Sequence, residues 1–297
     1  MLLVLVTALA PAAWGLTYWV TTELLPPDRP LLATVLRALP AGLLLVLVAR
    51  RLPRGSWWWR SVVLGLFNIG LFFSLLFVGA YRLPGGVAAV VGAVQPLIVA
   101  GLAAGLVGER LRLRTVLTGI AGVAGVALLV LGAQARLDPL GVAAALGGAS
   151  SMAVGVVLTK RWGRPAPLLA MTGWQLTAGG LLLVPLALLF EGPPPASLTG
   201  AHVIGFAYLS LVGTALAYVL WFRGVHALPV TVVTFLGLVA PLVATAVGWL
   251  ALRQTMSPAQ GVGALVVLTA LVVSQLHGRP GAPAPEPVSP RPGLVRL

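Results

Sequence analysis

Residues 83–97 read LPGGVAAVVGAVQPL, and residues 228–242 read LPVTVVTFLGLVAPL. The second stretch repeats the first at an offset of 145 residues: each begins with Leu-Pro, ends with Pro-Leu and carries a glycine at the same place, Gly92 and Gly237. Two prolines and a glycine in phase are hard to obtain by chance, even in a chain rich in Ala, Val, Leu and Gly. The pattern therefore predicts an internal repeat that divides the chain into two similar halves.

The composition places this repeat in a membrane. Hydrophobic residues make up 59% of the 297 residues and charged residues 8%, against about 45–50% and about 25% in soluble domains. The 19 basic residues stand in short gaps between long apolar runs, whereas a nucleic-acid binder clusters them on one polar face. The chain has no cysteine, so thiolate chemistry and Cys-based metal sites are excluded. The composition excludes a soluble enzyme and predicts an integral membrane protein with no nucleic-acid partner.

Ten stretches reach the length of about 20 apolar residues that a helix needs to cross a bilayer. They are Leu2–Thr22, Leu31–Ala49, Ser61–Tyr81, Pro84–Val107, Thr115–Ala135, Pro139–Thr159, Pro165–Phe190, Ala201–Phe222, Pro229–Leu252 and Ser257–Leu276. Each repeat then holds five spans, and because five is odd the second copy enters the membrane upside down. We expect an all-α membrane protein of ten transmembrane helices in two inverted five-helix repeats, residues 1–135 and 136–277, with a disordered Pro-rich tail at 278–297.

The basic residues predict the orientation of these spans. If the N-terminus is cytoplasmic, fourteen of the 19 basic residues fall on the cytoplasmic side, four fall on the opposite side and Arg37 lies within a span. Cytoplasmic loops of membrane proteins carry an excess of Lys and Arg. This distribution predicts a multi-pass protein with both termini in the cytoplasm.

The chain resembles a known transporter family. Ten spans in two inverted halves, the Leu-Pro…Pro-Leu pattern and Gly108-Glu109-Arg110-Leu111 after the fourth span resemble the drug/metabolite transporter superfamily, EamA type, over about residues 5–277. Within that family the chain looks like the YddG-type amino-acid exporters. The resemblance implies a transporter of the bacterial inner membrane, not an enzyme, with no cofactor and with a small-molecule substrate and the lipid bilayer as partners. A monomer is compatible with it. The second repeat departs from the family pattern, since Gln254 stands where a Glu would match Glu109.

Aromatic and uncharged polar residues at helical spacing within the spans predict a substrate cavity. Asn and Gln in hydrocarbon need hydrogen-bond partners and should face inward. The predicted substrate-binding residues are Trp14, Tyr18, Asn68, Phe72, Gly92, Gln95, Trp174, Gln175, Tyr218, Trp221, Thr234 and Gly237. Ordinary interhelix packing, or an aromatic side chain that faces lipid, is the alternative for each of them.

Two prolines predict a hinge or kink in the middle of spans four and nine. Pro96 and Pro241 lack the N–H that would bond the carbonyl four residues earlier, which belongs to Gly92 and Gly237. A freed carbonyl has to face protein, water or ligand. We therefore expect these two carbonyls in the cavity wall, with a kink that only shapes packing as the alternative.

Two charged residues are candidates for gating. Arg37 lies inside span two, where it either attracts a substrate carboxylate or gates the path, or instead snorkels to the outer interface or pairs with Glu23. Glu109 either gates or forms salt bridges with the neighbouring arginines. The histidines lie far apart near span ends, so no metal site is expected. They are His202, His226 and His277.

The six acidic residues all lie at span ends, in loops or in the tail. A proton- or sodium-coupled carrier usually places Asp or Glu within the membrane. The sequence therefore predicts facilitated export of a neutral or zwitterionic molecule by alternating access through a central uncharged cavity. The resemblance implies aromatic and other neutral amino acids or related small metabolites as the substrate. The alternative is a broad-specificity drug/metabolite efflux carrier.

Overall fold

The computed structural model describes residues 2–26, 29–82, 90–130, 138–195, 197–250 and 257–277. The regular structure of these residues is entirely helical. Nine of the described helical segments are long and apolar enough to cross a membrane, and Val90–Leu106 is a shorter apolar helix. The predicted fold class, an all-α membrane protein with ten transmembrane helices, is confirmed. The predicted Pro-rich tail lies outside the described residues.

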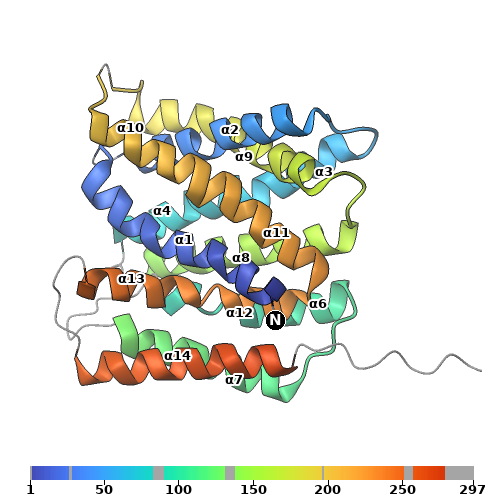
Figure 1. Cartoon of the computed structure of the whole chain (residues 1–297), viewed down its shortest axis with the longest axis vertical. Helices are drawn as coiled ribbons and strands as arrows, with labels where there is room; N and C mark the ends of the chain where they lie inside the picture. The colour runs from blue at the N-terminus through green and yellow to red at the C-terminus, as the bar shows by residue number, and fades with distance from the viewer. Residues whose placement is uncertain are drawn as a thin grey trace, which may run out of the picture.

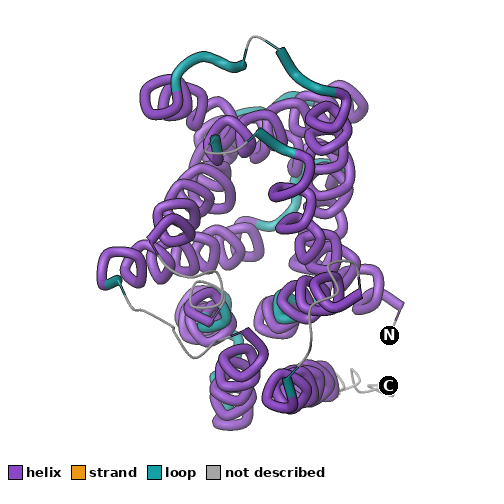
Figure 2. The backbone as a smooth tube through the Cα atoms, turned by 90° about the vertical axis from the view of Figure 1, so that its left-hand side faces the viewer, coloured by secondary structure: helices purple, strands orange, loops and turns teal. Residues whose placement is uncertain are grey.

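The helices run roughly side by side across the molecule (Figure 1). In the first half they are α1 (Leu2–Leu24), α2 (Pro30–Ala49), α3 (Trp57–Gly65), η1 (Leu66–Gly70), α4 (Leu71–Arg82), α6 (Gln95–Leu106) and α7 (Leu113–Val130). In the second half they are α8 (Pro139–Trp162), α9 (Leu168–Glu191), α10 (Gly200–Ala207), η2 (Tyr208–Leu216), α11 (Ala217–Ala227), α12 (Val230–Leu236), α13 (Val239–Leu250) and α14 (Pro258–His277). Figure 2 views the helices roughly along their axes and shows a bundle whose loops connect the helix ends.

Glycines allow two pairs of helices to pack at very short distance. A Cβ added at Gly42 of α2 would lie 2.4 Å from the backbone N of Thr177 in α9. A Cβ added at Gly263 of α14 would lie 2.6 Å from the backbone N of Leu129 in α7. Small residues let helix backbones approach closely within a membrane, where packing drives helix association. The pairs α2/α9 and α7/α14 therefore join the first half of the chain to the second.

Two spans contain a π-helical segment, η1 between α3 and α4 and η2 between α10 and α11. The 145-residue offset of the sequence repeat places η1 within η2. π-Helical turns make up well under 1% of residues in globular proteins and occur frequently at functional sites. The two segments are therefore the first places at which to look for a site.

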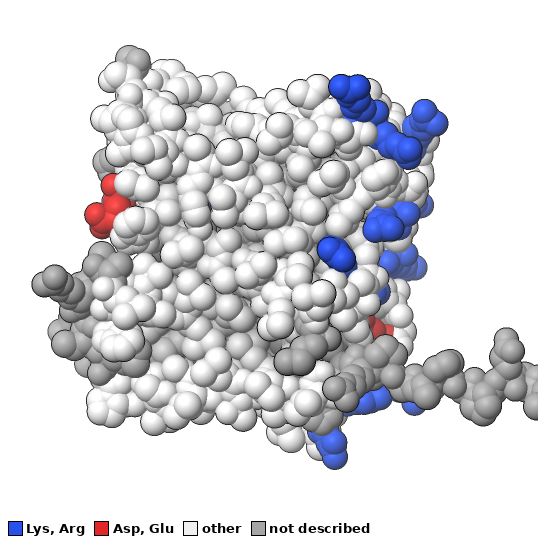
Figure 3. All heavy atoms as spheres, viewed as in Figure 1, with Lys and Arg blue, Asp and Glu red and all other residues white. Residues whose placement is uncertain are grey.

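Positive charge gathers at one end of the molecule. On the face seen in Figure 3, Lys and Arg lie at the right-hand end, where Figure 1 shows the α2–α3 and α8–α9 connections. The exposed basic residues of these connections and of the α6–α7 connection are Arg50, Arg51, Arg54, Arg110, Arg112 and Arg164, and Arg161 is exposed in the last turn of α8. Three connections that the sequence predicts to be cytoplasmic thus carry exposed basic residues.

Candidate functional site

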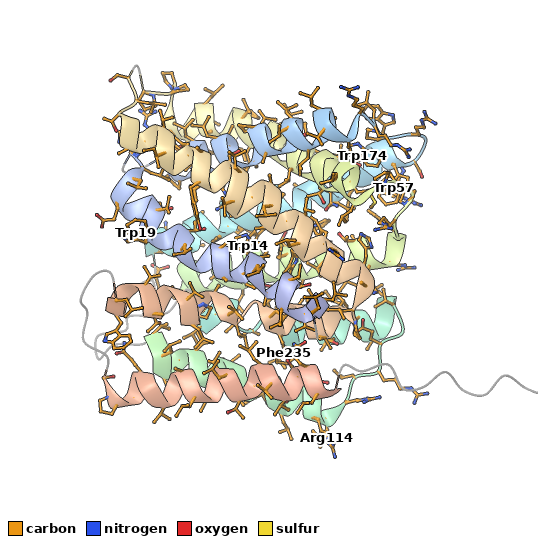
Figure 4. The ribbon with its side chains drawn as sticks, in the orientation of Figure 1. Trp14, Trp19, Trp57, Arg114, Trp174 and Phe235 are labelled. Carbon is orange, nitrogen blue, oxygen red and sulfur yellow. The ribbon has the colours of Figure 1, made fainter. Side chains whose placement is uncertain are left out.

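Three aromatic side chains from two helices form a cluster inside the protein. The ring of Trp14 on α1 lies 5.3 Å from that of Tyr218 and 5.2 Å from that of Trp221, both on α11. These separations lie in the range of favourable aromatic pairs. Trp14 is partly buried, whereas Tyr218 and Trp221 have exposed fractions of 1% and 2%. Three of the predicted site residues are thus brought together, and Figure 4 shows Trp14 away from the ends of the helices.

Arg37 on α2 is buried, with an exposed fraction of 6%. Its Nε donates to Oγ1 of Thr214 at 2.9 Å, and its Nη2 donates to the carbonyl of Gly213 at 3.0 Å. The guanidinium carbon lies 4.9 Å from the centre of the Phe73 ring, within cation–π range. The expectation that Arg37 snorkels or pairs with Glu23 is wrong, because its hydrogen-bond partners lie on η2 inside the bundle.

The carbonyl of Gly213 connects Arg37 to the aromatic cluster. It accepts a hydrogen bond from Nε1 of Trp14 at 3.0 Å as well as the one from Arg37. A π-helical turn changes the register of the backbone hydrogen bonds, and η2 presents this oxygen to two side chains from other helices. A guanidinium and an indole therefore stand side by side. The predicted uncharged cavity is corrected at this point, since an arginine lies next to the cluster and remains protonated in proteins.

A second group of buried polar side chains is centred on Asn68 of η1. Nδ2 of Asn68 donates to Oε1 of Gln175 at 2.9 Å and to Oγ1 of Thr159 at 3.3 Å. Asn68 and Gln175 have exposed fractions of 0% and 2%, as expected for amides within a membrane. Gly155 makes room for this group, because a Cβ there would lie 2.2 Å from Oδ1 of Asn68. The amides of Asn68 and Gln175 thus bind each other.

Spans four and nine are interrupted where the sequence repeat predicts it. A turn at residues 93 and 94 precedes α6, and a turn at residues 237 and 238 separates α12 from α13. The carbonyl of Gly237 accepts from the backbone N–H of Ala240 at 3.1 Å, so the expectation of a free carbonyl is wrong there. The turn supplies an i→i+3 bond in place of the one that Pro241 cannot form.

The surroundings of the two glycines also differ. Among the described residues, no atom lies within 4 Å of a Cβ added at Gly92, whereas a Cβ added at Gly237 would lie 3.0 Å from the carbonyl oxygen of Thr234. Gly92 and Gln95 are partly buried, and Pro96 beside them is buried in the first turn of α6. The open space at Gly92 is compatible with a cavity wall.

Other predicted site residues lie elsewhere. Nε1 of Trp174 donates to the carbonyl of Arg51 at 2.8 Å, and its ring lies 6.4 Å from that of Trp57. Figure 4 places both tryptophans at the basic end, away from Trp14. Oγ1 of Thr234 donates to the carbonyl of Thr231 within its own helix at 2.9 Å.

Two further predicted site residues remain. The ring of Phe72 lies 4.9 Å from that of Phe73, the ring beneath Arg37. Phe72 therefore adjoins the group that Arg37 forms with Phe73, Gly213 and Thr214. The side chain of Tyr18 lies outside the described part of the chain.

Glu109 caps a helix of the other half. Its Oε1 accepts from the backbone N–H of Val230 at 2.6 Å, and its Oε2 accepts from Oγ1 of Thr231 at 2.8 Å. Pro229 precedes this helix and offers no side-chain cap, so the carboxylate satisfies the first N–H groups and the positive end of the helix dipole. The expected salt bridges to neighbouring arginines are not found in the described structure. Nearby, Nζ of Lys160 donates to the carbonyl of Leu228 at 2.8 Å.

Glu109→Gln is expected to lower the free energy of unfolding by about 1 kcal/mol, because the amide keeps one acceptor and loses the charge. Thermal unfolding of the purified protein in detergent measures this change. The matched control is Glu23→Gln, since Glu23 is exposed at the end of α1. Equal melting temperatures for the two variants would contradict the capping role.

The sequence did not point to four of the residues that complete these groups, namely Phe73, Thr159, Gly213 and Thr214. The sequence held one indication of Gly213. The 145-residue offset of the repeat matches it with Asn68, which is a predicted site residue of the first half. The change of helical register that exposes the Gly213 carbonyl leaves no mark in hydrophobic periodicity.

A family model described as the EamA-like transporter family matches residues 1–131 and 139–275. Protein PecM of Dickeya dadantii (strain 3937) is 46% identical over 268 residues, which cover 90% of each chain. A chloroplastic WAT1-related protein of Arabidopsis thaliana is 32% identical, over 87% of this chain and 66% of its own. The uncharacterized transporter YvbV of Bacillus subtilis (strain 168) is 27% identical, over 87% and 86%.

A solved crystal structure has a similar fold. It superposes on 94% of this chain and 99% of its own with a TM-score of 0.79 and 22% sequence identity. At this identity the likeness concerns the fold alone.

Proposed function

The chain belongs to the EamA-like transporter family and is a membrane transporter, and we propose that it exports amino acids or related small metabolites. Aromatic and other neutral amino acids are the proposed substrates. The observation that carries this proposal is the cluster of Trp14, Tyr218 and Trp221 beside the buried guanidinium of Arg37. Aromatic side chains provide an apolar surface for a substrate side chain, and a guanidinium binds a carboxylate.

The proposed mechanism is alternating access by two inverted repeats, residues 1–135 and 136–277. Three observations support it. The family model matches the chain twice, the two π-helical segments agree in register with the sequence repeat, and equivalent helices of the two halves pack together as α2/α9 and α7/α14. In inverted-repeat transporters the substrate lies near the midplane between the repeats. Arg37 on α2 of one half binds Thr214 and Gly213 on η2 of the other half, and these contacts between the halves support such a position for the substrate.

We place both termini in the cytoplasm and the protein in the inner membrane of a bacterium. The accumulation of basic residues at one end of the helices supports this orientation, because cytoplasmic loops carry the excess of Lys and Arg. The bacterial relatives support the location.

Purified protein in liposomes is expected to take up labelled phenylalanine, tryptophan or related carboxylates in a saturable manner, with and without a pH gradient. No proton coupling is expected, because each described acidic residue lies at or beyond a helix end. A strict requirement for a proton gradient that Glu23→Gln abolishes would contradict this part. Transport of a cationic dye with no uptake of any carboxylate would favour the broad-specificity efflux carrier instead.

A further inference from the structure

The positive charge of Arg37 has no acidic partner among the described residues. Four of the six acidic side chains are described, and three of these are bound elsewhere: Glu109 caps α12, Glu191 binds the N–H groups of Leu31 and Leu32, and Asp138 lies near Arg82. Glu23 is exposed at the end of α1. The remaining two, Asp28 and Glu286, lie outside the described part. Arg37 is thus held by a hydroxyl, a carbonyl and an aromatic ring.

Neutral partners compensate a buried charge only in part. Removing a cation from water is costly unless it is paired and hydrogen-bonded, and an ionisable residue within a membrane is by default the sign of a functional site. The two described hydrogen bonds use two of the five N–H groups of the guanidinium. Within the described structure, its Nη1 side is thus free to bind an anion from outside the protein.

We propose that Arg37 is the anion-binding centre of this transporter and that its preferred substrate is an aromatic monocarboxylate that carries a net negative charge. The proposal rests on the proposed transport function and names the substrate class. The carboxylate binds the guanidinium in the bidentate manner usual for arginine. The aromatic ring of the substrate lies against Trp14, which shares the Gly213 carbonyl with Arg37.

A zwitterionic amino acid suits this site less well. Its ammonium group lies next to its carboxylate, and it would therefore be brought close to the guanidinium of Arg37. None of the described acidic residues is there to bind it, and like charges in a medium of low dielectric constant repel strongly. The same substrate without its amino group avoids this repulsion.

Transport of such an anion moves one negative charge across the membrane. The cell interior is negative, so the membrane potential drives the anion outward without a coupling proton. For a single charge, about 59 mV supports a tenfold concentration ratio. Export is therefore driven by voltage as well as by the substrate gradient.

The test uses the full chain in liposomes at pH 8, with a potassium diffusion potential set by valinomycin. The probes are labelled 3-phenylpropionate and labelled phenylalanine, which differ by the amino group alone. Liposomes without protein give the leak, which is subtracted. We expect faster uptake of 3-phenylpropionate than of phenylalanine, and faster uptake when the interior is positive than when it is negative.

Arg37→Gln is expected to reduce 3-phenylpropionate uptake by about thirtyfold or more, and the small remaining uptake should still respond to potential, because the substrate itself carries the charge. Arg37→Lys retains the positive charge but lacks the paired N–H donors that bind a carboxylate in the bidentate manner, so it should keep part of the voltage-dependent uptake. The matched control is Arg223→Gln, because Arg223 is exposed on α11 and should leave uptake unchanged. If Arg37→Gln does not fold, the Arg37→Lys variant and the voltage response of the wild-type protein decide whether the anion proposal holds.

Three results overturn the anion proposal: undiminished 3-phenylpropionate uptake by folded Arg37→Gln, uptake that does not respond to potential, or transport of phenylalanine with none of 3-phenylpropionate. The last result leaves the proposed amino-acid export intact. Uptake of neither probe contradicts both proposals.

Discussion

Gly42→Ala is expected to lower the free energy of unfolding by about 2–3 kcal/mol, the upper part of the range for overpacking a close contact. The added Cβ would lie 2.4 Å from the backbone N of Thr177 and 2.6 Å from its Oγ1. Backbone atoms of α9 cannot rotate away as a flexible side chain does. The two helices would have to separate along their contact, at which Cβ atoms added at Gly173 and Gly180 would also lie 2.9 Å from atoms of α2.

The matched control for this prediction is Gly101→Ala. Gly101 is also a helical glycine, on α6, and a Cβ there would meet no atom of the described residues within 4 Å. Its replacement should leave the free energy of unfolding unchanged or raise it by about 0.4–1 kcal/mol, because alanine reduces the conformational entropy of the unfolded chain. Thermal unfolding of both purified variants in the same detergent measures the difference. Equal melting temperatures would show that the α2/α9 contact is looser than described.

The spans could be predicted from the sequence because they depend on local composition. Span two, expected at Leu31–Ala49, is found as Pro30–Ala49, since charged residues and proline mark its ends. The breaks near Pro96 and Pro241 could be predicted for a similar reason, because proline lacks an N–H wherever it stands. Such features need no knowledge of the partner helix.

The partners of charged residues could not be predicted in this way. Glu109 has three arginines close by in the sequence, yet it binds backbone N–H groups more than a hundred residues away. Arg37 is directed inward because η2 presents a carbonyl and a hydroxyl to it, and the sequence gives no sign of that π-helix. These contacts follow from how the two halves pack.

The aromatic residues show the same limit. Helical spacing put Trp14, Tyr218 and Trp221 among the predicted site residues, and their rings lie together in the structure. It also suggested Trp174, whose indole N–H donates to the Arg51 carbonyl at the basic end. Tryptophan is an amphipathic side chain suited both to a cavity and to a membrane interface. Depth along the helix separates the two uses, and spacing alone does not give it.

Trp14→Ala is expected to reduce the initial rate of substrate uptake by about tenfold. The change removes two aromatic contacts of about 0.5–1.5 kcal/mol each, and about 1.4 kcal/mol corresponds to a factor of ten. It also removes the indole hydrogen bond to the Gly213 carbonyl, so Arg37 becomes the only side chain described on that oxygen. Both the apolar surface and the position of the guanidinium change together.

Trp14→Phe separates these two effects, because it keeps an aromatic ring near Tyr218 but cannot donate a hydrogen bond to the Gly213 carbonyl. Its uptake should lie between that of the wild-type protein and that of Trp14→Ala, measured in liposomes and normalised to inserted protein. Trp58→Ala is the matched control, since Trp58 is 57% exposed and should not affect uptake. Truncation of Tyr218 is less informative, because that side chain is 1% exposed and its loss leaves a destabilising cavity. If Trp14→Ala transports as fast as the wild-type protein, the aromatic cluster is a packing feature and the substrate binds elsewhere.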